Sequence, residues 1–154
     1  MPKIKKTEIK SETNNKTQKE SVKQSYYQAI GRRKESTARV RLIVGGTGEI
    51  TVNNKPISQY FSGEIAKIAY LEPLKLTDSL DRFNITVKVK GGGLSGQLGA
   101  VIHGIARALE KINKDQYRPA LKKAGLMTRD PRAKERRKAG YAHKARARKQ
   151  SPKR

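Results

Sequence analysis

The chain has 154 residues and a net charge of +23, from 36 lysines and arginines against 13 aspartates and glutamates. It has no cysteine, which excludes disulfides and thiolate metal sites and suits a reducing compartment. No apolar run approaches the roughly 18 residues that span a membrane, and the N-terminus lacks the apolar segment of a secretory signal. We therefore expect a cytoplasmic protein that binds a polyanion, nucleic acid above all, although charge alone would also permit anionic lipid.

Charge and apolar residues are unevenly distributed along the chain. Residues 26–115 carry +6 and have the apolar density of a core, whereas residues 116–154 carry +13, from 15 lysines and arginines against two acids. Almost no large apolar side chain follows Met127, so this segment needs a partner to fold against. We predict three parts: a disordered basic extension at 1–25, a globular domain at 26–125 and an extended basic tail at 126–154.

The apolar pattern of the first half of the domain predicts two strands and a helix. Apolar side chains at alternate positions over residues 38–44 predict a strand whose other face is mostly cationic. After a glycine-rich turn, residues 50–52 predict a short second strand. Apolar residues within 65–71 suit a short helix that Pro73 interrupts.

The second half predicts a strand and two helices. Apolar residues alternate within 81–90, and after three glycines they recur at helical spacing over 94–112. A shorter helix is predicted at 118–124, ending at Gly125. Three polar side chains lie on the other side of the long helix at i, i+4 and i+8: His103, Arg107 and Lys111. These elements predict an α+β fold, a two-layer α/β sandwich.

The glycines between the last strand and the long helix match a dinucleotide-binding fingerprint, Gly91-x-Gly93-x-x-Gly96. That site also needs an acid at the end of a second parallel strand, but Glu110 lies within the same helix. The sequence therefore disfavours a nicotinamide cofactor. Two interpretations stay open: the glycines allow a phosphate of RNA to approach the backbone, or they only form a tight turn.

No constellation of residues supports catalysis. Neither His103 nor His143 has the cysteine or carboxylate neighbours of a metal site, and we interpret both as surface or RNA-facing residues. Ser95 lacks the strand-to-helix elbow of a hydrolase nucleophile. We expect no enzyme activity, no cofactor and no metal.

Three cationic groups are candidate nucleic-acid contacts, with ordinary solvated charge as the alternative for each. The first is residues 32–34, the second is Arg39 with Arg41 on one strand face, and the third begins at Arg129 and includes Lys134. Arginine can bridge two phosphate oxygens, which favours structured RNA as the partner. Residues 131–154, extended at roughly 3.3 Å each, would span on the order of 80 Å, enough to thread deep into an RNA particle.

Three blocks of sequence resemble the bacterial-type small-subunit ribosomal protein S9 family: GRRKESTARV (31–40), GGGLSGQLGAVIHGIARAL (91–109) and LMTRDPRAKERRKAG (126–140). The resemblance covers about residues 26–154. It implies a fold related to the second domain of ribosomal protein S5, and a structural role in the head of the small subunit. It further implies binding to the 3′ major domain of the rRNA and a tail that reaches the anticodon stem-loop of P-site tRNA during translation.

The resemblance also implies particular contacts. Implied rRNA-binding residues are Arg32, Arg33, Lys34, Gly91, Gly92, Gly93, Gln97, Arg129, Arg132, Arg136, Arg137 and Lys138. To these we add Arg39, Arg41 and Arg107 from the cationic positions above. Lys153 and Arg154 are implied to contact tRNA, although the aromatic residue usual just before the family's final Ser-Lys-Arg is absent from this sequence.

The implied partners are small-subunit rRNA, P-site tRNA and neighbouring proteins of the head, with no membrane and no homo-oligomer. The protein subunit of another RNA machine, such as ribonuclease P, is the alternative within RNA binding. A nicotinamide-dependent enzyme is the alternative outside it.

Overall fold

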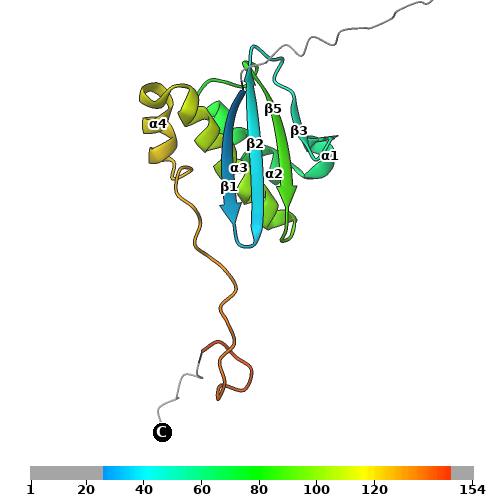
Figure 1. The fold of residues 1–154 in the computed structure, drawn as a ribbon, viewed down its shortest axis with the longest axis vertical. Coiled ribbons are helices and arrows are strands. Elements are labelled where there is room, and N and C mark those ends of the chain that lie inside the picture. The colour runs from blue at the N-terminus through cyan, green and yellow to red at the C-terminus, as the bar shows by residue number, and fades with distance from the viewer. Residues whose placement is uncertain (1–25, 147–154) are drawn as a thin grey trace, which may run out of the picture.

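The computed structural model describes residues 26–146, which form an α/β domain followed by an extended segment (Figure 1). The strands are β1 (Tyr26–Arg33), β2 (Ser36–Val44), β3 (Ile50–Val52), β4 (Lys55–Pro56) and β5 (Phe83–Lys90). The helices are α1 (Ile57–Tyr60), α2 (Glu64–Lys75), α3 (Leu94–Ile112) and α4 (Lys114–Lys123). This mixed architecture agrees with the predicted α+β class.

The five strands form one sheet in the order β1-β2-β5-β3-β4. All neighbours are antiparallel except β3 and β5, which are parallel. Helices α2 and α3 lie behind the sheet in Figure 1, so the other face of the central strands is left uncovered. Within the described residues, no helix has the length and apolarity to cross a membrane.

The core lies between the sheet and α3 and follows the two predicted periodicities. On β2 the side chains of Ala38, Val40 and Leu42 are buried, and the alternate side chains are mostly exposed. β5 repeats this pattern over its whole length, and α3 buries one face. Val44, predicted to share the apolar face of β2, is instead exposed at the end of the strand.

Two glycines let α3 approach β1 closely. A Cβ added to Gly31 on β1 would lie 1.9 Å from the main-chain oxygen of Ala100 on α3. A Cβ added to Gly104 would lie 2.6 Å from Cγ2 of Val40 and 3.3 Å from the nitrogen of Gly31. Since neither position has room for a side chain, the backbones of the helix and the edge strand pack directly against each other.

The sequence pattern does not predict β1, a strand that precedes the predicted one at residues 38–44. Arg32 and Arg33 end β1, and Lys34 lies in the turn to β2 with a positive φ of 50°. Only Ala29 and Gly31 of this edge strand are buried, so apolar alternation is absent. β1 is held instead by its ladder to β2 and by α3.

Helices α2 and α4 differ from their predicted extents. Pro73 does not interrupt α2: its ring is buried, and the helix continues to Lys75. Proline lacks the N–H that would bond to the Ala69 carbonyl oxygen, and the helix ends soon after it, at Lys75. α4 begins four residues earlier than predicted, since the side-chain oxygen of Asn113 caps the helix by accepting a hydrogen bond from the main-chain N–H of Gln116.

The chain leaves the domain after α4. Leu126 and Met127 still pack against the core, whereas residues 129–146 contain no helix or strand. In Figure 1 this segment (orange to red) runs away from the sheet and then curls back on itself. Within the curl, the Lys138 amide donates to the Lys144 carbonyl oxygen at 3.1 Å, and Glu135 pairs with Lys138 and Arg146.

Candidate nucleic-acid interface

The uncovered face of the sheet carries cations on its two central strands. The register places Arg39 of β2 directly opposite Lys88 of β5, and Thr37 opposite Lys90. These four side chains line one shallow depression. Like charges placed directly opposite each other on a sheet are destabilising, so this arrangement is unfavourable for the isolated domain and favourable for an anion that lies across both strands.

Arg41 extends the same face toward β1. Its guanidinium carbon lies 5.2 Å from the centre of the Tyr26 ring, a cation–π contact. Within residues 26–146, no carboxylate forms an ion pair with Arg39, Arg41, Lys88 or Lys90. The two arginines of this face are among the predicted contacts and the two lysines are not, although the alternation of the lysines with Val87 and Val89 identifies them as outward-facing.

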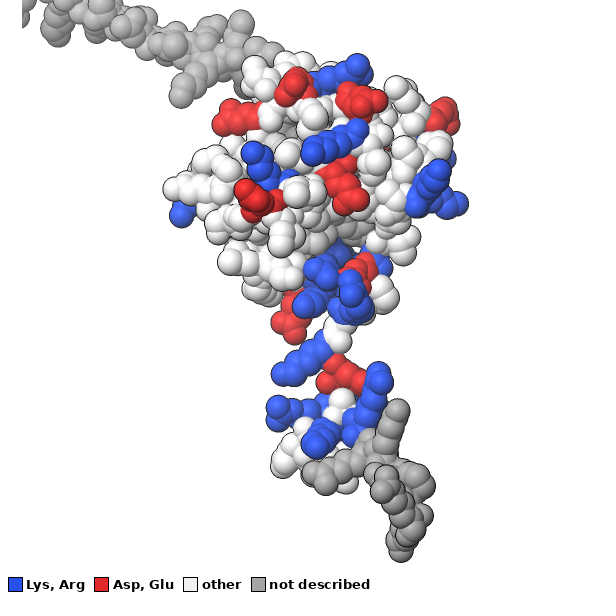
Figure 2. All heavy atoms as spheres, turned by 180° about the vertical axis from the view of Figure 1, so that it is seen from behind, with Lys and Arg blue, Asp and Glu red and all other residues white. Residues whose placement is uncertain are grey.

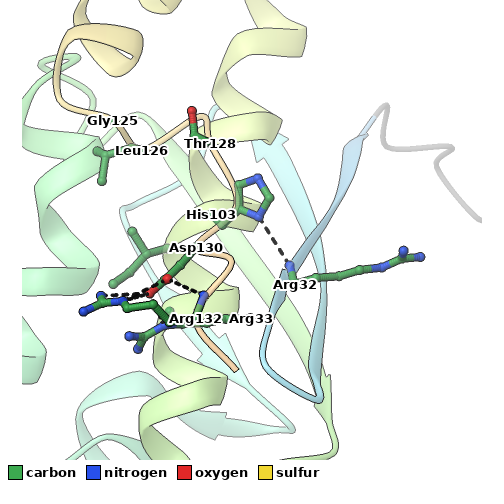
Figure 3. A pocket seen from close by; sticks show the side chains of 10 residues that line it. Arg32, Arg33, His103, Gly125, Leu126, Thr128, Asp130 and Arg132 are labelled. Carbon is green, nitrogen blue, oxygen red and sulfur yellow. Dashed lines mark hydrogen bonds and ion pairs between the residues drawn. The ribbon is translucent and has the colours of Figure 1, made fainter. Parts of the chain in front are cut away.

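One ion pair joins the base of the tail to the domain, and a second ion pair lies beside it within the tail. Nε of Arg33 at the end of β1 lies 3.0 Å from Oδ2 of Asp130, and Nη2 of Arg132 lies 2.9 Å from the same oxygen. Figure 3 shows the Asp130 carboxylate held between the two guanidinium groups. These groups lower the pKa of Asp130 far below its usual range, with the hydrogen bonds from Arg132 as the largest cause. Arg129 donates a longer hydrogen bond to the Lys34 carbonyl oxygen, at 3.4 Å.

His103 lies half-buried beside this junction. Its Nδ1 accepts a hydrogen bond from the main-chain N–H of Arg32 at 3.3 Å (Figure 3). Burial lowers the pKa of His103, repulsion by Arg107 and Arg129 lowers it further, and the nearby main chain of Met127 opposes the change. His103 is thus a partly exposed residue whose ring also supports the contact between α3, β1 and the tail, and its contact with RNA stays a prediction.

The polar side chains of His103, Arg107 and Lys111 on α3 cover the free edge of β1. Arg107 donates to the Ile30 carbonyl oxygen at 2.5 Å, and Lys111 donates to that of Gln28 at 2.7 Å. With His103 one turn earlier, three side chains at i, i+4 and i+8 bind main-chain groups of alternate residues along the strand. These side chains occupy one main-chain group of each of the three residues and so hinder the pairing of this edge with another chain. Arg107, one of our predicted rRNA contacts, thus has a structural role in the domain.

The glycine turn packs against the start of β2. Gly91 and Gly92 have φ angles of 76° and 61°, in the left-handed region that favours glycine. A Cβ on Gly92 would lie 2.2 Å from Oγ of the buried Ser36, and one on Gly96 would lie 2.7 Å from it. These close approaches agree with the interpretation of the glycines as a tight turn. Gly92 and Gly93 also line a depression with Lys34 and with Lys134 of the tail.

The remaining predicted contacts differ in how free their side chains are. Gln97 accepts from the Tyr60 hydroxyl at 2.8 Å and donates to the Gly91 carbonyl oxygen at 3.2 Å, so its amide is engaged within the domain. In the described part of the tail, the exposed side chains of Arg136 and Arg137 have no carboxylate in ion-pairing range. Lys153 and Arg154 lie outside the described residues.

No group of His, Cys, Asp and Glu side chains in residues 26–146 could hold a metal ion. An open cationic sheet face, a glycine turn flanked by lysines and a basic tail fastened beside them define a protein of the polyanion-binding class. Comparison with known sequences identifies the family within this class.

The chain belongs to the family described as ribosomal protein S9/S16, whose family model matches residues 31–154. It is similar to the small ribosomal subunit protein uS9 of Anaeromyxobacter sp. (strain K), with 56% identity over 111 residues. That alignment covers 72% of this chain and 84% of the relative. The uS9 protein of Anaeromyxobacter dehalogenans (strain 2CP-1) matches with the same identity and coverage. The resemblance predicted from the three sequence blocks is thereby confirmed, against the alternative of a ribonuclease P subunit.

Proposed function

We propose that this protein is a structural, non-catalytic component of the small ribosomal subunit that binds rRNA. Its membership of the ribosomal protein S9/S16 family supports this role, and its relatives carry the name of a small-subunit protein. The observation that carries the proposal is the Arg39–Lys88 pair on the uncovered face of the sheet. Two cations facing each other without a neighbouring carboxylate in residues 26–146 are stabilised when a phosphate backbone lies across them.

Within the subunit, we propose that the protein binds the 3′ major domain of the rRNA, which forms the head. The sheet face supplies Arg39, Arg41, Lys88 and Lys90, and the tail base supplies Arg129 and Lys134. Because residues 131–146 are almost all exposed and strongly basic, and their internal contacts are few, we infer that they gain most of their ordering contacts by lying against RNA. The globular part then ends near residue 127, because Leu126 and Met127 still pack against the core, and the basic segment beyond it threads into the particle.

At its far end we propose that the tail reaches the anticodon stem-loop of P-site tRNA through Lys153 and Arg154. A lysine–arginine pair can neutralise phosphates of the stem without any chemical step. Deleting these two residues should weaken binding of P-site tRNA and leave incorporation into the small subunit nearly intact. Loss of incorporation would instead identify the pair as an assembly element.

Sedimentation tests the central proposal. The tagged protein should migrate with small ribosomal subunits, and purified protein should bind an rRNA fragment of the head with an affinity that falls steeply as salt rises. Migration apart from small subunits, or an affinity that does not respond to salt, would contradict the proposal.

A further inference from the structure

Helix α2 exposes apolar side chains that the fold does not use. Ile65 is 86% exposed and Ile68 63%, and Leu76 just beyond the helix is 43% exposed. The buried side chains of α2 are Tyr70, Pro73 and Leu74, so the isoleucines predicted to form its core face lie on the opposite side. Two such isoleucines one helical turn apart form an anchor surface that is costly to leave in water.

A groove continues this surface toward α3. Phe61 and Ala66 line it from one side, and Leu94 and Leu98 line it from the other. Leu94 is itself 63% exposed at the start of α3, although its position in the amphipathic pattern predicts burial. Among the exposed apolar side chains, Leu94 thus lines a groove between the start of α3 and Ala66 of α2, the helix that also exposes Ile65 and Ile68.

The charge of this region is opposite to that of the chain as a whole. Residues 57–81 contain four acids and two lysines, a net charge of −2 within a chain of +23. The acids are Glu64, Glu72, Asp78 and Asp81, and all four are exposed. Figure 2 shows this side of the molecule, where acidic and basic side chains are interspersed over the domain and cations gather near the start of the tail.

We propose that the face formed by α2 and the start of α3 (the α2 face: Ile65, Ile68, Leu76 and Leu94, with the carboxylates of Glu64 and Glu72 on the same helix) binds a second protein of the same particle. The partner segment is rich in lysine and arginine and inserts apolar side chains against the two isoleucines. Exposed isoleucine offers nothing to a phosphate backbone, and the carboxylates repel it. The same carboxylates attract a basic protein segment, so charge complementarity selects protein over RNA.

The two sides of the domain thus have separate partners: RNA on the cationic sheet face and protein on the α2 face. A second copy of this chain is a poorer occupant, because two α2 faces would bring like charges together. This inference rests on the proposed function, since the partner is met within the small subunit.

Site-specific photocrosslinking tests the inference in assembled subunits. The full chain carries p-benzoylphenylalanine in place of Ile68 in one variant and of Thr86, on the outer sheet face, in the matched control. Irradiation of purified small subunits should give a protease-sensitive, nuclease-resistant product from position 68 and a nuclease-sensitive product from position 86. The crosslinked peptide from position 68 should come from a different protein and carry more lysine and arginine than acid.

Several results would overturn the α2 face as a protein site. A crosslink from position 68 to RNA, to residues 1–25 of the same chain, to a second copy or to an acidic peptide would each do so. The complete absence of a crosslink from position 68 would do so as well. Because both isoleucines are exposed, I65E/I68E should unfold at the same temperature as the unaltered protein while the protein crosslink from Leu94 falls several-fold. Lys67→Glu on the same helix keeps the apolar anchors and should retain that crosslink. Absence of the chain from small subunits would contradict the proposed function itself, whereas a wrong crosslink in a normal subunit contradicts only this inference.

Discussion

Arg33 and Asp130, 97 positions apart in sequence, form an ion pair at 3.0 Å that fastens the tail to the end of β1. Arg132 closes on the same carboxylate, and Leu126 and Met127 pack against the core just before it. The direction in which the basic tail leaves the domain is therefore set by one acid between two arginines. Asp130 is one of only two acids in the last 39 residues.

Replacing Asp130 by asparagine should loosen the base of the tail. The amide keeps the shape of the side chain but loses the charge that both arginines share. We expect trypsin to cleave after Arg129 and Lys134 several-fold faster in D130N, with the thermal unfolding of the domain nearly unchanged. Glu135→Gln is the matched control, since the partners of Glu135 among residues 26–146 are Lys138 and Arg146, both within the tail. Equal cleavage in both variants would show that the ion pair does not hold the tail.

The same junction should resist mild acid. The pKa of Asp130 is lowered in the folded protein, so its contribution is complete above the unfolded value of about 3.9 and is lost only as pH falls through the lower folded value. Tryptic sensitivity can be followed only near neutral pH, so a fluorescence distance between labels at the exposed positions 37 and 133 is the suitable measurement. That distance should stay constant from pH 8 to about pH 5 and increase only below about pH 4. An increase near pH 6 would point to His103 as the controlling group.

His103 should make the stability of the domain depend on pH in a different range. Its folded pKa lies below the unfolded value of about 6.5, so the unfolded chain binds more protons and stability falls as pH drops below that value. The slope cannot exceed about 1.4 kcal/mol per pH unit for one group. In His103→Asn, whose side-chain oxygen can still accept from Arg32, urea unfolding between pH 7.5 and 5.5 should become flatter. The control is His143→Asn, which replaces the other histidine of the chain and should keep the pH dependence of stability seen in the unaltered protein.

Much of the fold could be predicted because α3 and the two central strands bury one face each, which fixes their periodicity in the sequence. β1 could not, since it is an edge strand whose partners are main-chain groups and glycines rather than apolar side chains. Within the site, Arg39 and Arg41 could be recognised from their alternation alone. The use of His103, Arg107 and Lys111 on the β1 edge depends on how α3 lies across the sheet, which sequence spacing does not reveal.

Gly31 should be among the most sensitive positions of the domain. A methyl group there would overlap the Ala100 carbonyl oxygen, so Gly31→Ala must push α3 away from β1. We expect a loss of about 1–3 kcal/mol or more in the free energy of unfolding, measured in urea. Gly93→Ala is the control: nothing lies within 4 Å of the added Cβ and φ is −106°, so its effect should stay below about 1 kcal/mol. Similar losses in the two variants would show that the contact between α3 and β1 can relax.

Removing both cations of the facing pair should affect stability and RNA binding in opposite directions. In R39A/K88A the isolated domain loses a like-charge repulsion, and its free energy of unfolding should rise by up to about 1 kcal/mol. Its affinity for a head rRNA fragment should fall, and the slope of log affinity against log salt should decrease by about 2, one counterion release for each lost phosphate contact. K67A/K75A removes the same charge from α2 and should leave both the affinity at fixed salt and the slope close to those of the unaltered protein, because the α2 face does not meet RNA. Equal losses in the two double variants would mean that RNA senses only the net charge of the chain and that the sheet face has no special role.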